Sequence, residues 1–125
     1  MLKKILLIDD EKDFSDLTST MLEFNNLSVN TINDPINVMN DIENTHYDLI
    51  VSDLMMPNLD GFELVEKVRA NANYQKTPII ILTAKTLNDD ERKFLFQHQV
   101  HLLIKPFEPQ GLVEQIKNLL EKASA

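Results

Sequence analysis

A chain of 125 residues, 43% of them apolar, is long enough for one hydrophobic core and too apolar for a disordered segment, so we expect a single domain over residues 1–125. The absence of cysteine excludes disulfides, thiolate metal sites and thiol catalysis. The net charge of −8 disfavours direct contact with nucleic-acid phosphates, and no apolar run is long enough to span a membrane, so we expect a cytoplasmic protein without membrane insertion.

The first half of the chain alternates short apolar runs with amphipathic segments. Lys4–Ile8 is bounded by charge and too short for a helix, which predicts a buried strand. The next segment has apolar residues at helical spacing and ends at Asn25-Asn26. Residues 28–33 favour a second strand, and Pro35 is expected to open a second helix. The helical spacing of the first helix is that of Phe14, Leu17, Thr18, Met21 and Leu22, and the second helix is expected to turn Val38, Met39 and Ile42 inward.

The second half continues this alternation. Tyr47–Ser52 is the third expected strand, and Asp53 follows it directly. A loop through Pro57 and Asp60-Gly61 leads to a third helix, which carries Phe62, Val65 and Val68. The remaining elements are expected to be strands over 78–82 and 101–104 and helices over 88–97 and 109–122.

Five strands alternating with five helices predict an α/β fold with a parallel sheet and helices on both faces. We therefore expect a doubly wound (βα)5 three-layer sandwich. Open sheets of this kind bind ligands beyond the carboxyl ends of their strands, where the strand order reverses. If the first, third, fourth and fifth strands are neighbours, that edge gathers Asp9, Asp10, Asp53, Thr83 and Lys105.

Three clustered carboxylates need a compensating charge. Two like charges about 4 Å apart cost roughly 4 kcal/mol at an effective dielectric constant near 20, so either one acid takes up a proton or a cation neutralises the cluster. Asp9, Asp10 and Asp53 offer only oxygen ligands, which favour hard cations. Because Mg²⁺ commonly binds carboxylates, water and phosphate oxygens together, the sequence predicts a site for Mg²⁺ (or Mn²⁺) that is poised for a phosphoryl group.

The same edge holds the groups that phosphoryl transfer needs. An Asp carboxylate can act as a nucleophile and form an aspartyl phosphate. The reaction depends mainly on positioning and charge neutralisation. Lys105 offers a point positive charge and Thr83 offers a hydroxyl donor. The acids, a cation, Lys105 and Thr83 therefore make a complete set for that reaction.

Five segments in this order resemble the receiver domain of two-component response regulators, most closely a stand-alone receiver like the chemotaxis regulators. They are Ile-Leu-Leu-Ile with Asp9-Asp10-Glu11, Asp48-Leu-Ile-Val-Ser-Asp53-Leu-Met-Met-Pro57, Asp60-Gly61, Ile81-Leu-Thr83-Ala84, and Lys105-Pro106-Phe107. The resemblance covers essentially the whole chain. It implies a flavodoxin-like fold with strand order 2-1-3-4-5. It also implies a signalling switch that catalyses only its own phosphorylation and dephosphorylation.

The resemblance assigns a role to each acid. Asp53 is the residue that accepts phosphate from a phosphohistidine of a histidine kinase or a histidine phosphotransfer protein. Asp10 and Asp53 ligate Mg²⁺ together with the backbone carbonyl of Met55, and Asp9 holds the ion through water.

Other positions are implied to complete the switch. Lys105 pairs with Asp53 and then with the phosphoryl oxygens, and the peptide bond before Pro106 is cis. Thr83 moves to hydrogen-bond the phosphoryl group. Met55 and Lys85 occupy positions that influence the rate of dephosphorylation.

The resemblance also implies an output surface made by the fourth helix, the fifth strand and the fifth helix, which binds a downstream target protein. It implies that the protein is a monomer or a phosphorylation-dependent dimer. Family members usually carry an aromatic residue three positions before the lysine, where this chain has Leu102. They often have Gly-Ala before the fifth strand, where this chain has Gln97-His98-Gln99-Val100. We therefore expect Leu102 to replace the aromatic residue as a switch position.

Three other interpretations compete with a phosphorylated stand-alone receiver. A phosphatase with an Asp nucleophile would have two acids separated by one residue after the first strand, which here gives Asp9 and Glu11 and leaves Lys105 unexplained. An interaction module that is never phosphorylated would not need the acids and the lysine. A receiver that forms part of a longer regulator is the third alternative. His46, His98 and His101 lack the spacing of metal ligands, so we assign them no chemistry.

Overall fold

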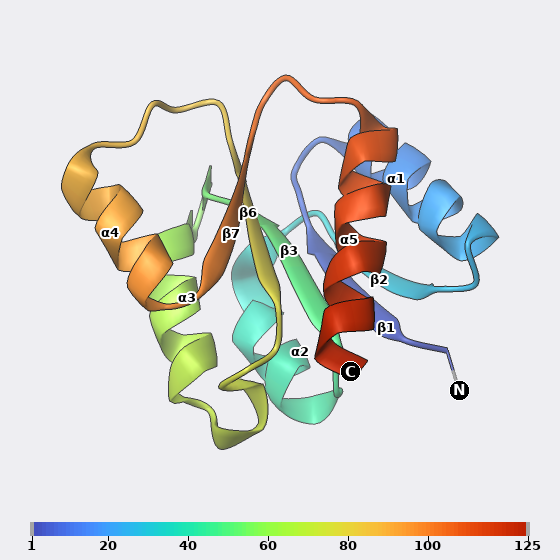
Figure 1. The fold of residues 1–125 in the computed structure, drawn as a ribbon, viewed down its shortest axis with the longest axis horizontal. Coiled ribbons are helices and arrows are strands. Elements are labelled where there is room, and N and C mark those ends of the chain that lie inside the picture. Colours follow the sequence, from blue (N-terminus) through green and yellow to red (C-terminus); the bar gives the residue numbers. More distant parts are fainter. Residues whose placement is uncertain (1, 125) are drawn as a thin grey trace.

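Five apolar runs form the central parallel sheet of the computed structural model, which describes residues 2–124 (Figure 1). Its strands are β1 (Lys4–Ile8), β2 (Ser28–Ile32), β3 (Leu49–Asp53), β6 (Ile79–Thr83) and β7 (Val100–Ile104). Their order across the sheet is β2-β1-β3-β6-β7, with every neighbouring pair parallel. Counted along the chain this is the order 2-1-3-4-5, so the predicted topology is confirmed.

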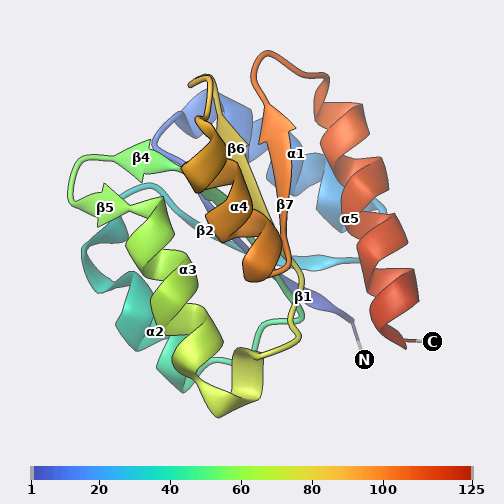
Figure 2. The same ribbon diagram turned by 60° about the vertical axis from the view of Figure 1, so that its left-hand side comes forward.

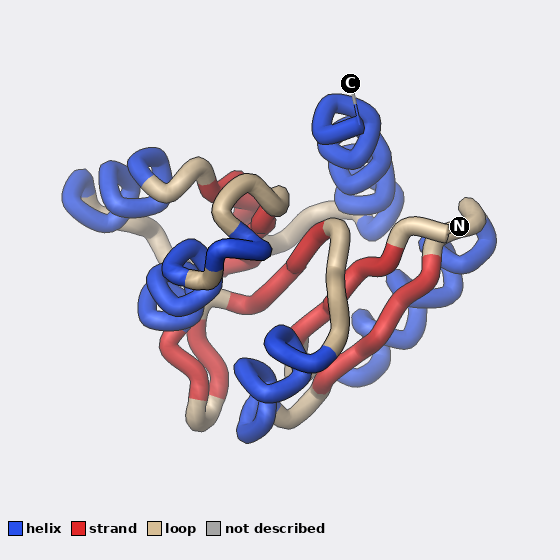
Figure 3. The backbone as a smooth tube through the Cα atoms, turned by 90° about the horizontal axis from the view of Figure 1, so that it is seen from below, coloured by secondary structure: helices blue, strands red, loops and turns tan. Residues whose placement is uncertain are grey.

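Helices cover both faces of the sheet, as the alternation of elements predicts. One face carries α1 and α5, and the other carries α2, α3 and α4 (Figure 3). None of the described helices is long and apolar enough to cross a membrane. The helices are α1 (Lys12–Phe24), α2 (Val38–Asn44), α3 (Gly61–Ala70), α4 (Asp89–Gln97) and α5 (Pro109–Ser124), with short 3₁₀ helices η1 (Pro35–Asn37) and η2 (Ala72–Tyr74).

The strand β1 shows why the apolar runs are continuous. Successive side chains of a strand point to opposite faces, so Ile5 and Leu7 pack with α1 and α5, while Leu6 and Ile8 pack in the core under α2, α3 and α4. All four are fully buried. A strand that is covered on both faces gains hydrophobic stabilisation from every residue, so it has no alternation of apolar and polar residues.

The structure adds detail that the sequence pattern does not predict. The segment after Asp53, expected as a loop, forms a short antiparallel hairpin of β4 (Met55–Met56) and β5 (Leu59–Asp60), which Figure 2 shows beside α3. Asn58 at its turn has a φ of 66°, a left-handed conformation that Asn tolerates better than most residues. The hairpin leads the chain from the end of β3 to the start of α3.

Several element boundaries also differ from expectation. The third strand runs over Leu49–Asp53 rather than 47–52, so Asp53 ends the strand instead of following it. The second helix begins with the 3₁₀ turn η1 at Pro35 before it becomes α2. The last strand begins at Val100 rather than His101, because Gln99 takes a left-handed φ of 57° and turns the chain out of α4. Gln99 thus supplies a conformation that glycine adopts without a steric cost.

Candidate functional site

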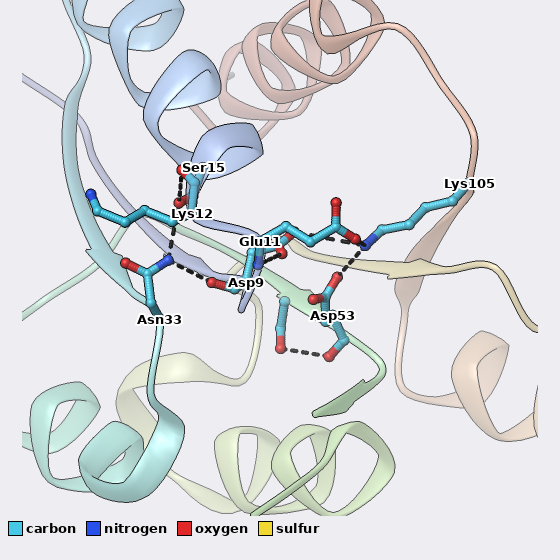
Figure 4. A network of polar contacts seen from close by, with 8 residues as sticks. Asp9, Glu11, Lys12, Ser15, Asn33, Asp53 and Lys105 are labelled. Atoms are coloured by element: carbon cyan, nitrogen blue, oxygen red, sulfur yellow. Dashed lines mark hydrogen bonds and ion pairs between the residues drawn. The ribbon is translucent and has the colours of Figure 1, made fainter. Parts of the chain in front are cut away.

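The carboxyl ends of the strands bring the predicted site residues to one edge of the sheet. Asp9 follows β1, Asp53 ends β3, Thr83 ends β6 and Lys105 follows β7. Figure 4 shows the side chains of Asp9, Asp53 and Lys105 converging there. The positions depend on strand register, because Asp53 is paired with Leu82 and Thr83 with Ile104.

Three acids form a cluster at this edge. Asp9, Asp10 and Asp53 each have a carboxylate oxygen that lies within 4.8 Å of the others. Asp9 and Asp53 are buried, whereas Asp10 is exposed. The cluster is therefore closed toward the core and open to solvent on the side of Asp10.

Lys105 is the cation that the described residues bring to these acids. Its Nζ lies 2.9 Å from Asp53 Oδ1, 3.4 Å from Glu11 Oε1 and 3.8 Å from Asp9 Oδ2. This one ammonium group compensates only part of the negative charge of the surrounding carboxylates. The peptide bond between Lys105 and Pro106 is cis, as the resemblance implied.

The electrostatics reflect this shortage of positive charge. Burial raises the pKa of Asp53 to about 7; the negative charge of Asp9 adds to the rise, and Lys105 opposes it. Burial also raises the pKa of Asp9, against the opposing effects of the Glu11 N–H and Lys105. For Lys105, burial lowers the pKa, but the ion pairs with Asp53, Asp9 and Glu11 outweigh it and leave the pKa raised.

The two buried acids have oxygens that fit a hard cation. Among the described residues, Asp9 Oδ2 is a buried side-chain oxygen that accepts no hydrogen bond, while the buried Asp53 Oδ1 has Lys105 Nζ as its ion-pair partner at 2.9 Å. A buried oxygen without a donor costs free energy unless another ligand satisfies it. Oxygen donors alone suit Mg²⁺ better than a thiophilic or imidazole-binding metal. The residues present therefore fit the predicted Mg²⁺.

Main-chain and side-chain donors fix the position of Asp9. Its Oδ1 accepts a hydrogen bond from the Glu11 N–H at 2.8 Å, and its carbonyl oxygen accepts one from Asn33 Nδ2 at 2.7 Å. Asn33 also donates to Ser15 Oγ at 3.0 Å and so joins the end of β2 to α1 (Figure 4). Asn33 follows a strand end, which is the signal that could have identified it as a supporting residue.

The other expected positions surround the acids. Thr83 is buried, and its Oγ1 accepts a hydrogen bond from the Lys85 N–H at 2.9 Å. The side chain of Met55 is exposed two residues after Asp53, in β4. Lys85 points to Glu91, with Nζ 2.7 Å from Oε2. Leu102 is half-buried in β7 and packs against the core cluster beneath α4.

An aromatic contact beside Lys105 was not predicted from the sequence. The rings of Phe14 and Phe107 meet edge to face with centroids 5.5 Å apart. With Glu11, Lys105 and two neighbours, Ala84 and Pro106, they line a cavity of about 420 Å³. In the sequence, Phe107 is only part of a motif, since nothing in its spacing indicates that it meets α1.

Comparisons with known proteins agree with this arrangement. The family described as the response regulator receiver domain matches residues 5–117. The chain is 34% identical to the regulatory protein VanRc of Enterococcus gallinarum over 122 residues, which cover 98% of this chain and 52% of that protein. It is also 34% identical to the response regulator ArlR of Staphylococcus saprophyticus over 119 residues, which cover 95% of this chain and 53% of that protein. The chain thus spans about half the length of the curated relatives it matches.

Solved structures with the same fold include chains that this chain covers almost completely. A CheY-like response regulator receiver domain protein from Methanospirillum hungatei superposes with a TM-score of 0.87 at 28% identity, covering 98% of this chain and 96% of that chain. The receiver domain of the Francisella response regulator 1452 superposes with a TM-score of 0.84 at 30% identity, covering 97% and 98% of the two chains. The chain therefore belongs to the response regulator receiver domains of two-component signalling.

Proposed function

We propose that this chain is a switch in which Asp53 takes the phosphoryl group of a phosphohistidine, carried by a histidine kinase or a histidine phosphotransfer protein. The observation that carries the proposal is the position of the Asp53 carboxylate, 2.9 Å from Lys105 and within a cluster of acids at the edge of the sheet. An Asp53 oxygen attacks phosphorus, the P–N bond breaks, and the histidine nitrogen keeps the electron pair.

The acid cluster is proposed to hold Mg²⁺ or Mn²⁺. Its ligands are the carboxylates of Asp10 and Asp53 and the backbone carbonyl of Met55, with Asp9 acting through water. When bound, such an ion neutralises charge on the phosphoryl oxygens. The buried Asp9 Oδ2, which accepts no hydrogen bond and lies 3.8 Å from Lys105 Nζ, supports this proposal.

Two side chains of the protein supply the remaining contacts. Lys105 is paired with Asp53, and its ammonium group is proposed to pair with a phosphoryl oxygen as the aspartyl phosphate forms. The hydroxyl of Thr83, at the end of the neighbouring strand β6, is proposed to donate a hydrogen bond to another phosphoryl oxygen. Both groups stabilise charge that develops during the transfer.

The output is proposed to be a change at the face formed by α4, β7 and α5, where a downstream protein binds. β7 is an edge strand, and α4 exposes Phe96 while β7 exposes Ile104. Leu102, a residue of β7 that packs against the core, is the proposed relay.

Met55 and Lys85 are proposed to tune the lifetime of the phosphoryl group. We further propose that the output requires no direct contact with nucleic acid, and that the switch acts as a monomer or a phosphorylation-dependent dimer.

Incubation with a small phosphodonor tests the reaction without a kinase. With phosphoramidate and Mg²⁺, the chain is expected to gain one labile phosphoryl group by intact mass, and chelation of the cation is expected to stop this gain. Lys105→Met is expected to lower the rate about 10- to 100-fold, because the developing charge loses its cation. Lys12→Met, which removes a lysine paired with Asp16 on the exposed side of α1, is the control.

Three results would contradict the proposal. The first is labelling that is independent of the cation. The second is an equal labelling rate in Lys105→Met. The third is continuous turnover of a simple phosphate ester, which would indicate the competing phosphatase.

A further inference from the structure

The loop of residues 84–88, between β6 and α4, is tied at both ends by a single residue, Lys85. Its backbone N–H donates to Thr83 Oγ1 at 2.9 Å, and its side-chain Nζ donates to Glu91 Oε2 at 2.7 Å. Thr83 ends β6, and Glu91 lies in the first turn of α4. Lys85 therefore links the hydroxyl of the site to the helix of the proposed output face.

Glu91 is held in place before it meets Lys85. Its Oε1 accepts from the Asn88 N–H at 3.0 Å, while Asn88 Oδ1 accepts from the Glu91 N–H at 2.8 Å, and the two form a capping box. Only 19% of the Glu91 side chain is exposed. Hydrogen bonds from Lys85 and then from the Asn88 N–H lower the pKa of Glu91. A carboxylate fixed in this way loses less conformational entropy on pairing than a free surface glutamate.

The far end of the loop is anchored in the core. Leu87 is buried in the cluster beneath α4, and its carbonyl oxygen accepts a hydrogen bond from Arg92 Nε at 3.2 Å. With Leu87 and Asn88 fixed, a change at Thr83 has to be absorbed in residues 84–86. Lys85 is the residue of that segment whose side chain is ion-paired to α4.

The hydrogen bond at Thr83 favours the present orientation of its side chain. In this structure Thr83 Oγ1 is the acceptor for the Lys85 N–H. If the side chain rotates to place its oxygen beside a phosphoryl group, the Lys85 N–H loses that acceptor. The contact between Lys85 and Glu91 opposes this rotation because it holds the Lys85 backbone next to Thr83.

We propose that the Lys85–Glu91 ion pair is a latch that holds Thr83 in its resting orientation, so that Lys85 and Glu91 are positioning residues for phosphoryl transfer. The inference rests on the proposed function of Asp53 and Thr83. Opening the latch favours the orientation of Thr83 that binds the phosphoryl group. Because exposed ion pairs contribute modestly to stability, the expected effect is about two- to fivefold.

Four variants separate the latch from other roles of these residues. Glu91→Gln removes the charge but keeps the capping box, since Gln at this position can also accept from the Asn88 N–H. Lys85→Met removes the ammonium group, and the double variant removes both partners. Lys85→Arg retains a cation that can pair with Glu91 and is expected to raise the rate less than Lys85→Met does.

Lys67→Met provides the matched control. Lys67 Nζ lies 2.9 Å from Glu63 Oε1, and 54% of its side chain is exposed, close to the 55% of Lys85. Both residues of this pair belong to α3, outside the loop of residues 84–88. Lys67→Met therefore measures the effect of losing a comparable ion pair elsewhere.

The first measurement is the initial rate of phosphoryl uptake from phosphoramidate with Mg²⁺, followed by intact mass. Glu91→Gln, Lys85→Met and the double variant are each expected to raise the rate about two- to fivefold and to agree with one another, because each opens the same latch. Unchanged rates would overturn the inference. Opposite effects of Glu91→Gln and Lys85→Met would also overturn it, since they would show that the freed lysine acts on the phosphoryl group directly.

The second measurement is amide hydrogen exchange of Lys85 in the unphosphorylated protein, which needs no phosphodonor. Exchange is expected to be about two- to fivefold faster in Glu91→Gln and Lys85→Met and unchanged in Lys67→Met. Equal exchange in all variants would overturn the latch. If the unaltered chain took up no phosphoryl group, the proposed function would fail, and the exchange rates would still decide whether the latch exists.

Discussion

The charge of the acid cluster has a cost to folding. Asp53 is 5% exposed and lies close to two other acids, and its pKa rises to about 7 as a result. A group whose charged form is less stable in the folded protein than in the unfolded chain lowers the free energy of unfolding at pH values where it is ionised. Lys105 offsets part of this loss.

Removal of the Asp53 charge is therefore expected to stabilise the protein when divalent cations are absent. The ordinary pKa of 3.8 describes the unfolded chain and about 7 the folded one, so the folded state holds the proton more tightly and stability falls as the pH rises between these values. Asp53→Asn is expected to raise the free energy of unfolding by about 1–3 kcal/mol at pH 8 and to flatten its dependence on pH. Urea unfolding with a chelator at pH 5 and pH 8 measures both effects.

Asp60→Asn is the control for this comparison. Asp60 is an exposed acid that caps α3, with Oδ1 accepting from the Phe62 N–H at 2.9 Å. Asn caps a helix about as well as Asp, so little change in stability is expected. If Asp53→Asn were no more stable than the unaltered chain at pH 8, the account of a charge-strained cluster would be wrong.

The main residues of the site could be predicted from the sequence because parallel strands end at the same edge. Asp9, Asp53 and Lys105 each lie at or one residue past a strand end, so the topology alone brings them together. The contacts of Glu11 with Lys105 and of Asn33 with Asp9 depend on how loops run across that edge. No periodicity in the sequence determines those paths.

At the scale of elements, the connection from β3 to α3 is packed too tightly to accept a side chain. The Gly61 N–H donates to the Leu54 carbonyl oxygen at 2.6 Å. A Cβ at Gly61 would lie 2.5 Å from that oxygen and 2.9 Å from Leu54 Cα, both backbone atoms. Leu54 directly follows Asp53, so this contact supports the position of the proposed phosphoacceptor.

Gly61→Ala is expected to lower the free energy of unfolding by about 1–3 kcal/mol, since the backbone has to move to relieve the overlap. It is also expected to slow phosphoryl uptake, because the displaced segment carries Asp53. Urea unfolding and labelling by phosphoramidate measure the two effects.

Gly111→Ala is the matched control, because a Cβ there meets nothing within 4 Å and lies in the first turn of α5. Alanine is the better helix former, so this change is expected to be neutral or to stabilise the protein by up to about 1 kcal/mol. Equal stability losses in the two variants would contradict the packing argument at Gly61.

Elements with strong periodicity were predicted well, whereas turns were not. The run Ile79–Leu82 and the helical spacing of α5 are signals that extend over many residues. The hairpin of β4 and β5 has only two residues in each strand, Met55-Met56 and Leu59-Asp60, and neither pair has a strand signature. The left-handed Gln99 was also unpredictable, because Gln has no preference for that conformation.

At the scale of the whole molecule, β7 connects the site to the proposed output face. Its residue Ile104 pairs with Thr83, and Lys105 follows at the site. Leu102, two residues earlier, packs into the core beneath α4. An aliphatic residue at this position can change rotamer but has no hydroxyl to form a hydrogen bond in either state.

Phosphorylation is therefore expected to alter the amide chemical shifts of residues 86–105 more than those of α2. Couplings between sites are commonly about 1–3 kcal/mol, which is enough to shift populations without refolding the chain. The chemical shifts of the free and the phosphorylated protein measure this response, and Asp53→Asn treated with the same phosphodonor is the control. Shifts confined to the acid cluster would contradict the proposed output face.

Leu102→Ala isolates the contribution of the relay. It removes apolar contacts with the core beneath α4 and is expected to shrink the shift changes in α4 while Asp53 still takes up phosphate. Leu103→Ala is the matched change on the other side of the strand, because Leu103 packs against the cluster under α1 and α5. Equal effects of both variants would contradict a specific role for Leu102.

The overall architecture was the most predictable level, because alternation of strands and helices with right-handed crossovers leaves few topologies. The two layers of helices and the strand order follow from that rule and the family resemblance. The network that joins Lys85 to Glu91 could not be predicted, because residues six apart meet only when the loop between them bends back.

Asp53, among several acids at one edge of the sheet, is the residue proposed to receive the phosphoryl group. Borohydride reduction of the labelled protein converts an aspartyl phosphate to homoserine, which peptide mass spectrometry locates by residue. After treatment with phosphoramidate and Mg²⁺, homoserine is expected at position 53 and nowhere else, and Asp53→Asn is expected to give none. Homoserine at position 9 or 10, or a labelled protein without any homoserine, would contradict the account.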